Sequence, residues 1–247
     1  MTDISEMIHT MYPSTDVVVG QVDFMAPNFP SAWSEIHYKA YPRYRRVPLA
    51  LDHARVAVDV LLTEAAFRRR STSSFDGSSE LTLEEISFLF RVSCGINRHT
   101  GDRTDDYRRV QPSGGARYPI EIYILQRQSS DLDRGLYHFN SLENCLEMLP
   151  YPVDEVMTVV AEPLVNNAPA FVFLTYVMPI NAIKYRERGL ALGLIEAGHI
   201  GQGFCLGAAA TGIKIRPFLG FDQQAAMRAL RLPPGIEYPI YMLALGR

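Results

Sequence analysis

The chain lacks an apolar run long enough to cross a bilayer. Its longest apolar stretch, Ala168 to Ile180, contains two prolines and is shorter than the roughly 20 residues that a membrane helix needs. The N-terminal residues include Asp3 and Glu6 and lack the basic-then-apolar pattern of an export signal. The sequence therefore predicts a protein that neither spans a membrane nor is exported.

Cysteine is scarce as well. The three cysteines are odd in number, lie far apart and match no metal-ligand spacing: Cys94, Cys145 and Cys205. This pattern argues against a disulfide framework and against a metal site. We expect buried thiols in a cytoplasmic protein.

A basic excess is also missing. The formal net charge is −3, and the arginine clusters at 43–46, 68–70 and 108–109 are too short to form a basic face. Nucleic acid is therefore not an expected partner. The 47% hydrophobic and 21% charged residues are typical of a soluble globular protein.

The periodicity divides the chain into two parts. Residues 1–49 are rich in Pro, Tyr and Arg, and we expect an N-terminal extension that packs on a core domain of residues 50–247. Leu51 to Arg70 has apolar residues at near-helical spacing. Thr82 and Glu85 predict a capping box at the start of a second helix.

From Pro119 the pattern becomes that of strands. Ile120–Gln126 alternates, and the apolar run 169–177 is typical of a central strand. A hairpin at 135–139 and 145–149, a strand at 213–215, a helix at 222–230 and a strand at 238–245 complete the pattern. The predicted fold class is α+β, with helices flanking a mixed, mostly antiparallel sheet.

One predicted helix is unusual in its glycine content. It runs from about Lys184 to Ala210 and contains six glycines, at 189, 193, 198, 201, 203 and 207. Each glycine in an exposed helix costs about 1 kcal/mol relative to alanine. We therefore expect close packing around this helix, against a partner subunit.

The most informative segment lies between Pro112 and Pro119. It reads Pro112-Ser113-Gly114-Gly115-Ala116 and is almost devoid of side chains. Such a segment presents bare backbone N–H groups to a flat or anionic ligand. The alternative is a tight turn before an edge strand.

Two further stretches have a functional and a structural interpretation. Arg69-Arg70-Ser71 could bind a phosphate, or the arginines could simply face the negative end of a helix dipole. At 216–222, Gly220 could direct a backbone N–H at a ligand, or the stretch could be a loop in which Asp222 caps the next helix.

Lys184 and Tyr185 are candidates for proton chemistry. They can act near neutral pH only if their surroundings lower a pKa that is normally near 10; otherwise they are a half-buried tyrosine beside a lysine that reaches water. We expect His199 to be a hydrogen-bonded core residue and Glu196 to have a basic partner.

These stretches, in this order, resemble the nitroreductase superfamily of flavoproteins, and more narrowly its SagB-type dehydrogenases, the FMN-dependent azoline oxidases. The similarity runs from about Trp33 to Arg247. It is carried by the stretches 41–43, 69–75, 112–116, 135–138, 184–185, 196–202, 220–221 and 243–247.

The resemblance implies an obligate homodimer with FMN at the subunit interface. It assigns Arg69, Arg70 and Ser71 to the phosphate and ribityl chain, and Leu219–Gly220 to flavin N5. It assigns Pro112, Ser113, Gly114 and Gly115 to the flavin of the other subunit. Lys184 and Tyr185 correspond to the catalytic pair.

The chain departs from the family pattern at Ser73, where a basic residue is frequent. We expect Ser73 in the cofactor site, with Arg247 as a second phosphate ligand. Either Lys184 or Tyr185 would be the base, and a charged Lys184 would lower the pKa of Tyr185.

The expected activity is oxidation of a thiazoline or oxazoline to the azole, in a peptide or a carrier-tethered intermediate. A cyclodehydratase or a peptide synthetase would be the partner. One alternative is an NAD(P)H-dependent reductase of nitroaromatics or quinones. Another is a non-catalytic scaffold subunit of a peptide-modifying complex.

Overall fold

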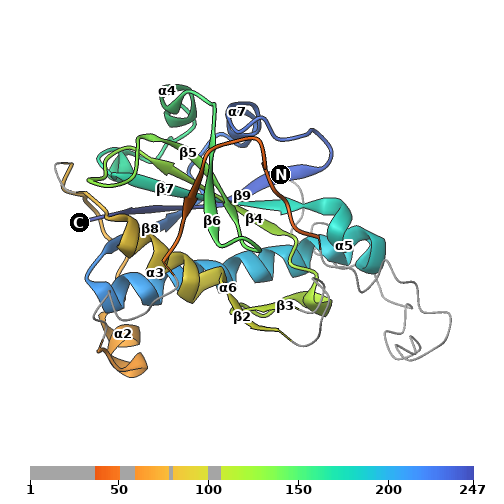
Figure 1. Cartoon of the computed structure of the whole chain (residues 1–247), viewed down its shortest axis with the longest axis horizontal. Helices are drawn as coiled ribbons and strands as arrows, with labels where there is room; N and C mark the ends of the chain where they lie inside the picture. Colours follow the sequence, from red (N-terminus) through yellow and green to blue (C-terminus); the bar gives the residue numbers. More distant parts are fainter. Residues whose placement is uncertain (1–36, 51–58, 78–79, 100–106) are drawn as a thin grey trace, which may run out of the picture.

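The computed structural model describes residues 37–50, 59–77, 80–99 and 107–247. At its centre lies a seven-stranded sheet in the order β1-β6-β5-β4-β7-β9-β8, with every neighbouring pair antiparallel (Figure 1). A parallel bridge between Ser71 and Ile215 extends the sheet beyond β8. The strands are β1 (Arg46–Pro48), β4 (Ile120–Gln126), β5 (Gly135–Asn140), β6 (Cys145–Leu149), β7 (Ala170–Val177), β8 (Lys214–Phe218) and β9 (Glu237–Gly246).

Helices cover both faces of this sheet. On one face lie α3 (Leu83–Cys94) and α6 (Arg188–Thr211), and on the other α4 (Val153–Met157) and α7 (Gln223–Ala229) (Figure 1). Phe90 of α3 links the first layer, since its ring contacts Phe204 of α6 at 5.3 Å and Phe139 of β5 at 4.9 Å between centroids. The α+β prediction is confirmed.

Smaller elements complete the fold. They are α2 (Leu62–Arg68), α5 (Met178–Tyr185), two 3-10 turns at Gly114–Ala116 and Pro163–Val165, and a ribbon of β2 (Ile96–His99) and β3 (Tyr107–Arg109). No pattern in the sequence had predicted the ribbon or α4.

The predicted strands are present, but the strand after Pro119 lies inside the sheet and not at its edge. β4 lies between β5 and β7 and is buried along its whole length, so the alternative of an edge strand after Pro119 is wrong. β8 is the edge strand and continues to Phe218, beyond the predicted end at 215. It includes Pro217, which is tolerated here because the outer side of β8 is paired only at the Ile215 bridge within the described residues.

The capping box is confirmed. Thr82 Oγ1 accepts from the Glu85 backbone N–H at 3.2 Å, and the Glu85 carboxylate accepts from the Thr82 N–H at 2.9 Å. The helix predicted over 51–70 is shorter in the structure, since α2 covers Leu62–Arg68 and residues 59–61 are not helical. Residues 51–58 lie outside the described part of the chain.

The predicted glycine-rich helix begins later than expected. Lys184 and Tyr185 end α5, and α6 begins at Arg188 after Arg186 adopts a φ of +50°. Close packing within the subunit is present at five of the six glycines of α6, all but Gly198, and packing against a partner subunit stays a prediction. A Cβ at Gly193 would lie 2.5 Å from the Tyr176 ring, and one at Gly203 would lie 2.8 Å from the Ser93 backbone. Glycine therefore lets α6 lie directly on β7 and α3.

Two further expectations concern burial and the N-terminal segment. All three cysteines are buried free thiols, as predicted. The described part of the N-terminal segment places β1 beside β6 in the main sheet, and the division at residue 50 stays a prediction. No helix in the described part of the chain has the length and apolarity needed to cross a membrane.

Candidate active site

The glycine segment forms a tight, conformationally restricted turn. Gly115 has a φ of +63°, and Ala116 and Tyr118 also adopt positive φ values of +53° and +51°. Positive φ is unfavourable for residues with a Cβ, so surrounding contacts must hold this backbone. One such contact is the Tyr118 N–H, which donates to Ser113 Oγ at 2.9 Å.

Lys184 and Tyr185 lie directly against this turn. A Cβ at Gly115 would be 3.0 Å from Lys184 Nζ and would overlap the Tyr185 hydroxyl. Lys184 Nζ lies 5.4 Å from the centre of the Tyr185 ring. The structure thus brings together two stretches that are about 70 residues apart in the sequence, and Gly115 is the residue that permits the contact.

The electrostatics of the pair differ from the expectation. Burial, followed by the charge of Arg117, lowers the pKa of Lys184. Burial raises the pKa of Tyr185, with Arg117 opposing it. The hypothesis that Tyr185 ionises beside a charged Lys184 is therefore disfavoured, because burial penalises the phenolate. The same burial and the charge of Arg117 favour the uncharged form of the Lys184 amine.

Glu196 lies buried beside the same turn. Gln111 Nε2 donates to Glu196 Oε1 at 3.4 Å. Burial raises the pKa of Glu196 to about 7, opposed by hydrogen bonding from Ser113 and by the charge of Arg109. Arg109 is thus the expected basic neighbour of Glu196, and it acts on the carboxylate through its charge. His199 is exposed on α6, next to Gly198 on the open side of the helix. The expectation of a core histidine is therefore wrong.

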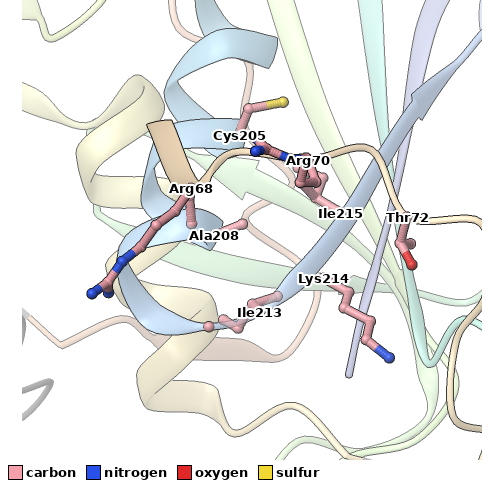
Figure 2. Close-up of a pocket in the computed structure, with 10 residues that line it drawn as sticks. Arg68, Arg70, Thr72, Cys205, Ala208, Ile213, Lys214 and Ile215 are labelled. Atoms are coloured by element: carbon pink, nitrogen blue, oxygen red, sulfur yellow. The ribbon is translucent and has the colours of Figure 1, made fainter. Parts of the chain in front are cut away.

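The arginine stretch borders a cavity of about 400 Å³ next to the C-terminal part of α6 (Figure 2). Arg68, Arg70, Thr72 and Lys214 are among the residues that line it. Arg70 extends across the cavity towards Cys205, whereas Arg68 points away from it (Figure 2). Lys214 was not predicted from the sequence, because only the pairing of this segment with β8 places it there.

Local contacts fix the arginine stretch on the edge of the sheet. Ser71 forms the parallel bridge with Ile215, and the Thr72 N–H donates to the Ile215 carbonyl at 2.9 Å. Arg70 Nη1 donates to the carbonyls of Phe67 and Arg69 at 2.7 and 2.8 Å. The structural interpretation therefore holds for Nη1 of Arg70, which binds carbonyls at the end of α2.

The remaining predicted ligands lie near this edge. Leu219 is 69% exposed directly after β8, and Gly220 accepts from the Ala161 N–H at 3.0 Å. Asp222 caps α7 by accepting from the Ala225 N–H at 2.8 Å, as the structural interpretation predicted. Ser73 is exposed. Arg247 forms an ion pair with Glu85.

The two parts of the candidate site lie far apart along α6. Gly114 packs near Leu192, whereas the charge of Arg69 acts on Cys205. Thirteen helical residues separate Leu192 and Cys205, a distance of about 20 Å. The glycine turn and the arginine stretch of one subunit therefore do not meet at a single point.

An apolar surface lies on the N-terminal half of α6. Leu190, Leu194 and Ile195 are 43%, 38% and 52% exposed, and Gly198 faces open space. Apolar side chains grouped on one helix face are typical of a protein–protein interface.

A family model named "Nitroreductase family" matches residues 66–247. The chain belongs to the nitroreductase family. It is 25% identical over 192 residues to "Putative nitroreductase MJ1384" of Methanocaldococcus jannaschii, covering 76% of this chain and 92% of that protein. It is 26% identical over 191 residues to the microcin B17-processing protein McbC of Escherichia coli, covering 72% and 67%.

Solved structures share the nitroreductase-like fold. The E. coli microcin synthetase McbBCD complex, with truncated pro-MccB17 bound, contains a chain that matches with a TM-score of 0.63, 20% identity, and coverage of 81% of this chain and 78% of that one. A nitroreductase-family structure from Exiguobacterium sibiricum, solved with FMN, matches with a TM-score of 0.54, 13% identity, and coverage of 78% and 90%.

Proposed function

We propose that the protein is an FMN-dependent oxidase that converts thiazoline or oxazoline rings to thiazoles or oxazoles, in a peptide or a carrier-tethered substrate. The observation that carries the proposal is the contact of Lys184 and Tyr185 with Gly115. It supports the proposal because the amine of Lys184, the proposed proton acceptor, lies beside the backbone turn that the family resemblance assigns to the flavin ring. The similarity to McbC, a microcin-processing protein, supports a peptide substrate.

The residues present fit FMN. The cavity at the arginine stretch offers cationic and hydroxyl groups to a phosphate, through Arg70, Thr72 and Lys214. Ser71 lies beside it on the edge of the sheet, and the charge of Arg69 acts on Cys205, which lines the cavity. The glycine turn exposes main chain at Gly115, where a flat ring can approach closely.

A homodimer accounts for the separation of the two parts. With about 20 Å along α6 between them, the glycine turn of one subunit would complete the site formed by the arginine stretch of the other. The exposed apolar residues of α6 are the proposed interface. This arrangement gives the glycine content of α6 a second role, because Gly198 leaves space for a second copy.

The chain's own groups then have separate roles in the oxidation. Two adjacent ring carbons each lose a hydrogen in the oxidation. The neutral Lys184 amine accepts the proton from one of them, and the hydride leaves from the other. The Tyr185 hydroxyl, held against Gly115, orients the ring, and such alignment contributes several kcal/mol, on the order found for well-oriented reactions. FMN held by the arginine stretch and the glycine turn would supply the hydride acceptor, and dioxygen would be the terminal oxidant.

The substrate would be delivered by a second enzyme. A ring must form from a cysteine, serine or threonine before it can be oxidised, so a cyclodehydratase or a peptide synthetase is the expected partner. The fold match to the McbBCD complex is consistent with assembly into a peptide-modifying complex.

The second candidate is an NAD(P)H-dependent reductase of nitroaromatics or quinones. The similarity to MJ1384, which covers most of both chains, favours it. Anaerobic mixing of the FMN-loaded protein separates the two functions. Bleaching of the flavin absorbance by a thiazoline peptide supports the oxidase, and rapid bleaching by NADPH alone supports the reductase. A colourless protein that does not bind FMN would contradict both and leave the scaffold alternative.

A further inference from the structure

Arg117 is the largest of the fully buried side chains in the described residues. It follows the glycine turn by two residues and is 1% exposed. Its Nε donates to the Ile180 carbonyl of α5 at 2.7 Å. A guanidinium remains charged at any pH at which a protein folds, so its burial is costly unless its charge and donors are used.

The position of Arg117 links the two elements that form the candidate active site. It belongs to the segment of Gly115, and it binds the helix that ends with Lys184 and Tyr185. The Ile180 carbonyl lies one helical turn before Lys184. A movement of Arg117 would therefore change the contact between the turn and the catalytic pair.

We propose that Arg117 is a positioning residue: its buried guanidinium fixes α5 against the glycine turn and holds a positive charge near the Lys184 amine. This inference rests on the proposed function for the role of Lys184 as a base. Its electrostatic part concerns the protein alone and is measurable without substrate.

The groups around Lys184 support this role. From the glycine turn, Arg117 acts on Lys184 and lowers its pKa, adding to the effect of burial. From its own helix, the Tyr185 ring lies 5.4 Å from Lys184 Nζ and also feels the charge of Arg117. A fixed positive charge disfavours a second one nearby, so the amine loses its proton more easily.

Other charged groups also lie near Arg117 in the described part of the chain. Arg117 borders a cavity of about 530 Å³ that Lys39, Glu121 and Glu237 also line. Glu237 forms an ion pair with Lys39 at 2.5 Å, and Glu121 bonds His138 Nε2 at 2.9 Å. The pKa of His138 is raised overall, because its hydrogen bonds to Glu121 and Glu147 outweigh the lowering effect of burial. A charged imidazole beside these acids is therefore favoured.

The test measures the reactivity of Lys184 towards an amine-selective acylating reagent as a function of pH, with peptide mass mapping to isolate this lysine. The full-length protein is compared with R117Q, R117K and the control R134Q. Arg134 is an exposed arginine that pairs with Asp154 on the surface. Circular dichroism and FMN content identify the variants that keep the native fold.

We expect the reactivity midpoint of Lys184 to rise by about one pH unit in R117Q. This corresponds to about tenfold slower labelling at any pH below the midpoint. R117K keeps the charge and should stay close to wild type, as should R134Q. An unchanged labelling midpoint of Lys184 in folded R117Q would overturn the proposal. If R117Q does not fold, R117K decides, and a rise of its labelling midpoint by a full pH unit would overturn the proposal.

The pH dependence of azoline oxidation gives the second readout. In R117Q, the fall in kcat on the acidic side should move to higher pH by the same amount, with activity recovered at alkaline pH. A merely structural role would lower kcat equally at all pH values. If the wild type oxidises no azoline but the labelling follows the expectation, the proposed function fails and the role of Arg117 in the charge state of Lys184 stands.

Discussion

The Tyr185 hydroxyl occupies the space that a side chain on residue 115 would fill. This contact joins the end of α5 to the turn at Gly114–Ala116, and it requires both the missing Cβ and the positive φ of Gly115. A single methyl group at this position therefore tests the architecture of the candidate active site.

Gly115→Ala should displace Tyr185 and Lys184 and lower azoline oxidation by about 100-fold, because small misplacements of reacting groups are costly. The strain of a positive φ should also cost about 1 kcal/mol of stability. Gly235→Ala is the matched control, since Gly235 has a φ of +75° and faces open space. Equal activity in the two variants would show that the contact has no catalytic importance.

Lys184→Ala and Tyr185→Phe should keep FMN and the native fold but lose most of the oxidation. Removal of a general base costs about 10²- to 10⁴-fold, and the effect of Tyr185→Phe should be smaller because the tyrosine orients the ring. Steady-state oxidation of an azoline peptide measures both. Full turnover by Lys184→Ala would mean that the base is another group.

Glu196 should make stability depend on pH. Its pKa rises to about 7 in the folded protein, against about 4.3 in an unfolded chain. The folded state therefore holds an extra proton between these values, and stability falls as pH rises through this range. Glu196→Gln should remove this loss, so its stability relative to wild type should be about 3 kcal/mol more favourable at pH 8 than at pH 4. Urea unfolding measures the free energy of unfolding of both proteins at each pH. The same difference between variant and wild type at pH 4 and pH 8 would refute this prediction.

Arg69→Gln should weaken FMN binding by at least about tenfold and leave riboflavin binding nearly unchanged, because a charge-assisted bond to phosphate is lost. Flavin fluorescence titration measures both affinities. Arg134→Gln, on the surface, serves as the control. Equal losses for FMN and riboflavin would place Arg69 at the ring or the ribityl chain.

Ile195→Asp should separate the proposed dimer, since it places a charge on the exposed apolar face of α6. The variant should sediment as a monomer and bind FMN poorly. Leu164→Asp changes an apolar residue of similar exposure on a 3-10 turn outside α6 and should remain dimeric. A monomeric wild-type protein with full FMN affinity would contradict the interface.

The sequence predicted the core strands and the capping box well because their signals are local. The apolar run of β7 predicts a strand within a few residues, and the pair Thr82 and Glu85 likewise predicts a helix start. The start of α6 was misplaced because Lys184 and Tyr185 continue the helical pattern of α6, and the positive φ of Arg186 that divides the helices has no local signal.

The site was predictable only in part, for the same reason. Gly115, Lys184 and Tyr185 were identified as candidates, but their contact arises from the packing of α5 on the turn. Arg117 was overlooked because its burial and its bond to Ile180 depend on tertiary structure. Lys214 joins the arginine cavity only through the pairing of β8 with the segment at Ser71.

The most direct test of the account is the mass of a thiazoline peptide after aerobic incubation with the FMN-loaded protein and with its Lys184→Ala variant. The account predicts that the wild type removes two hydrogens from each ring and that the variant, with the same flavin content, leaves the peptide unchanged. An unchanged peptide with the FMN-loaded wild type, or equal conversion by the variant, would contradict it.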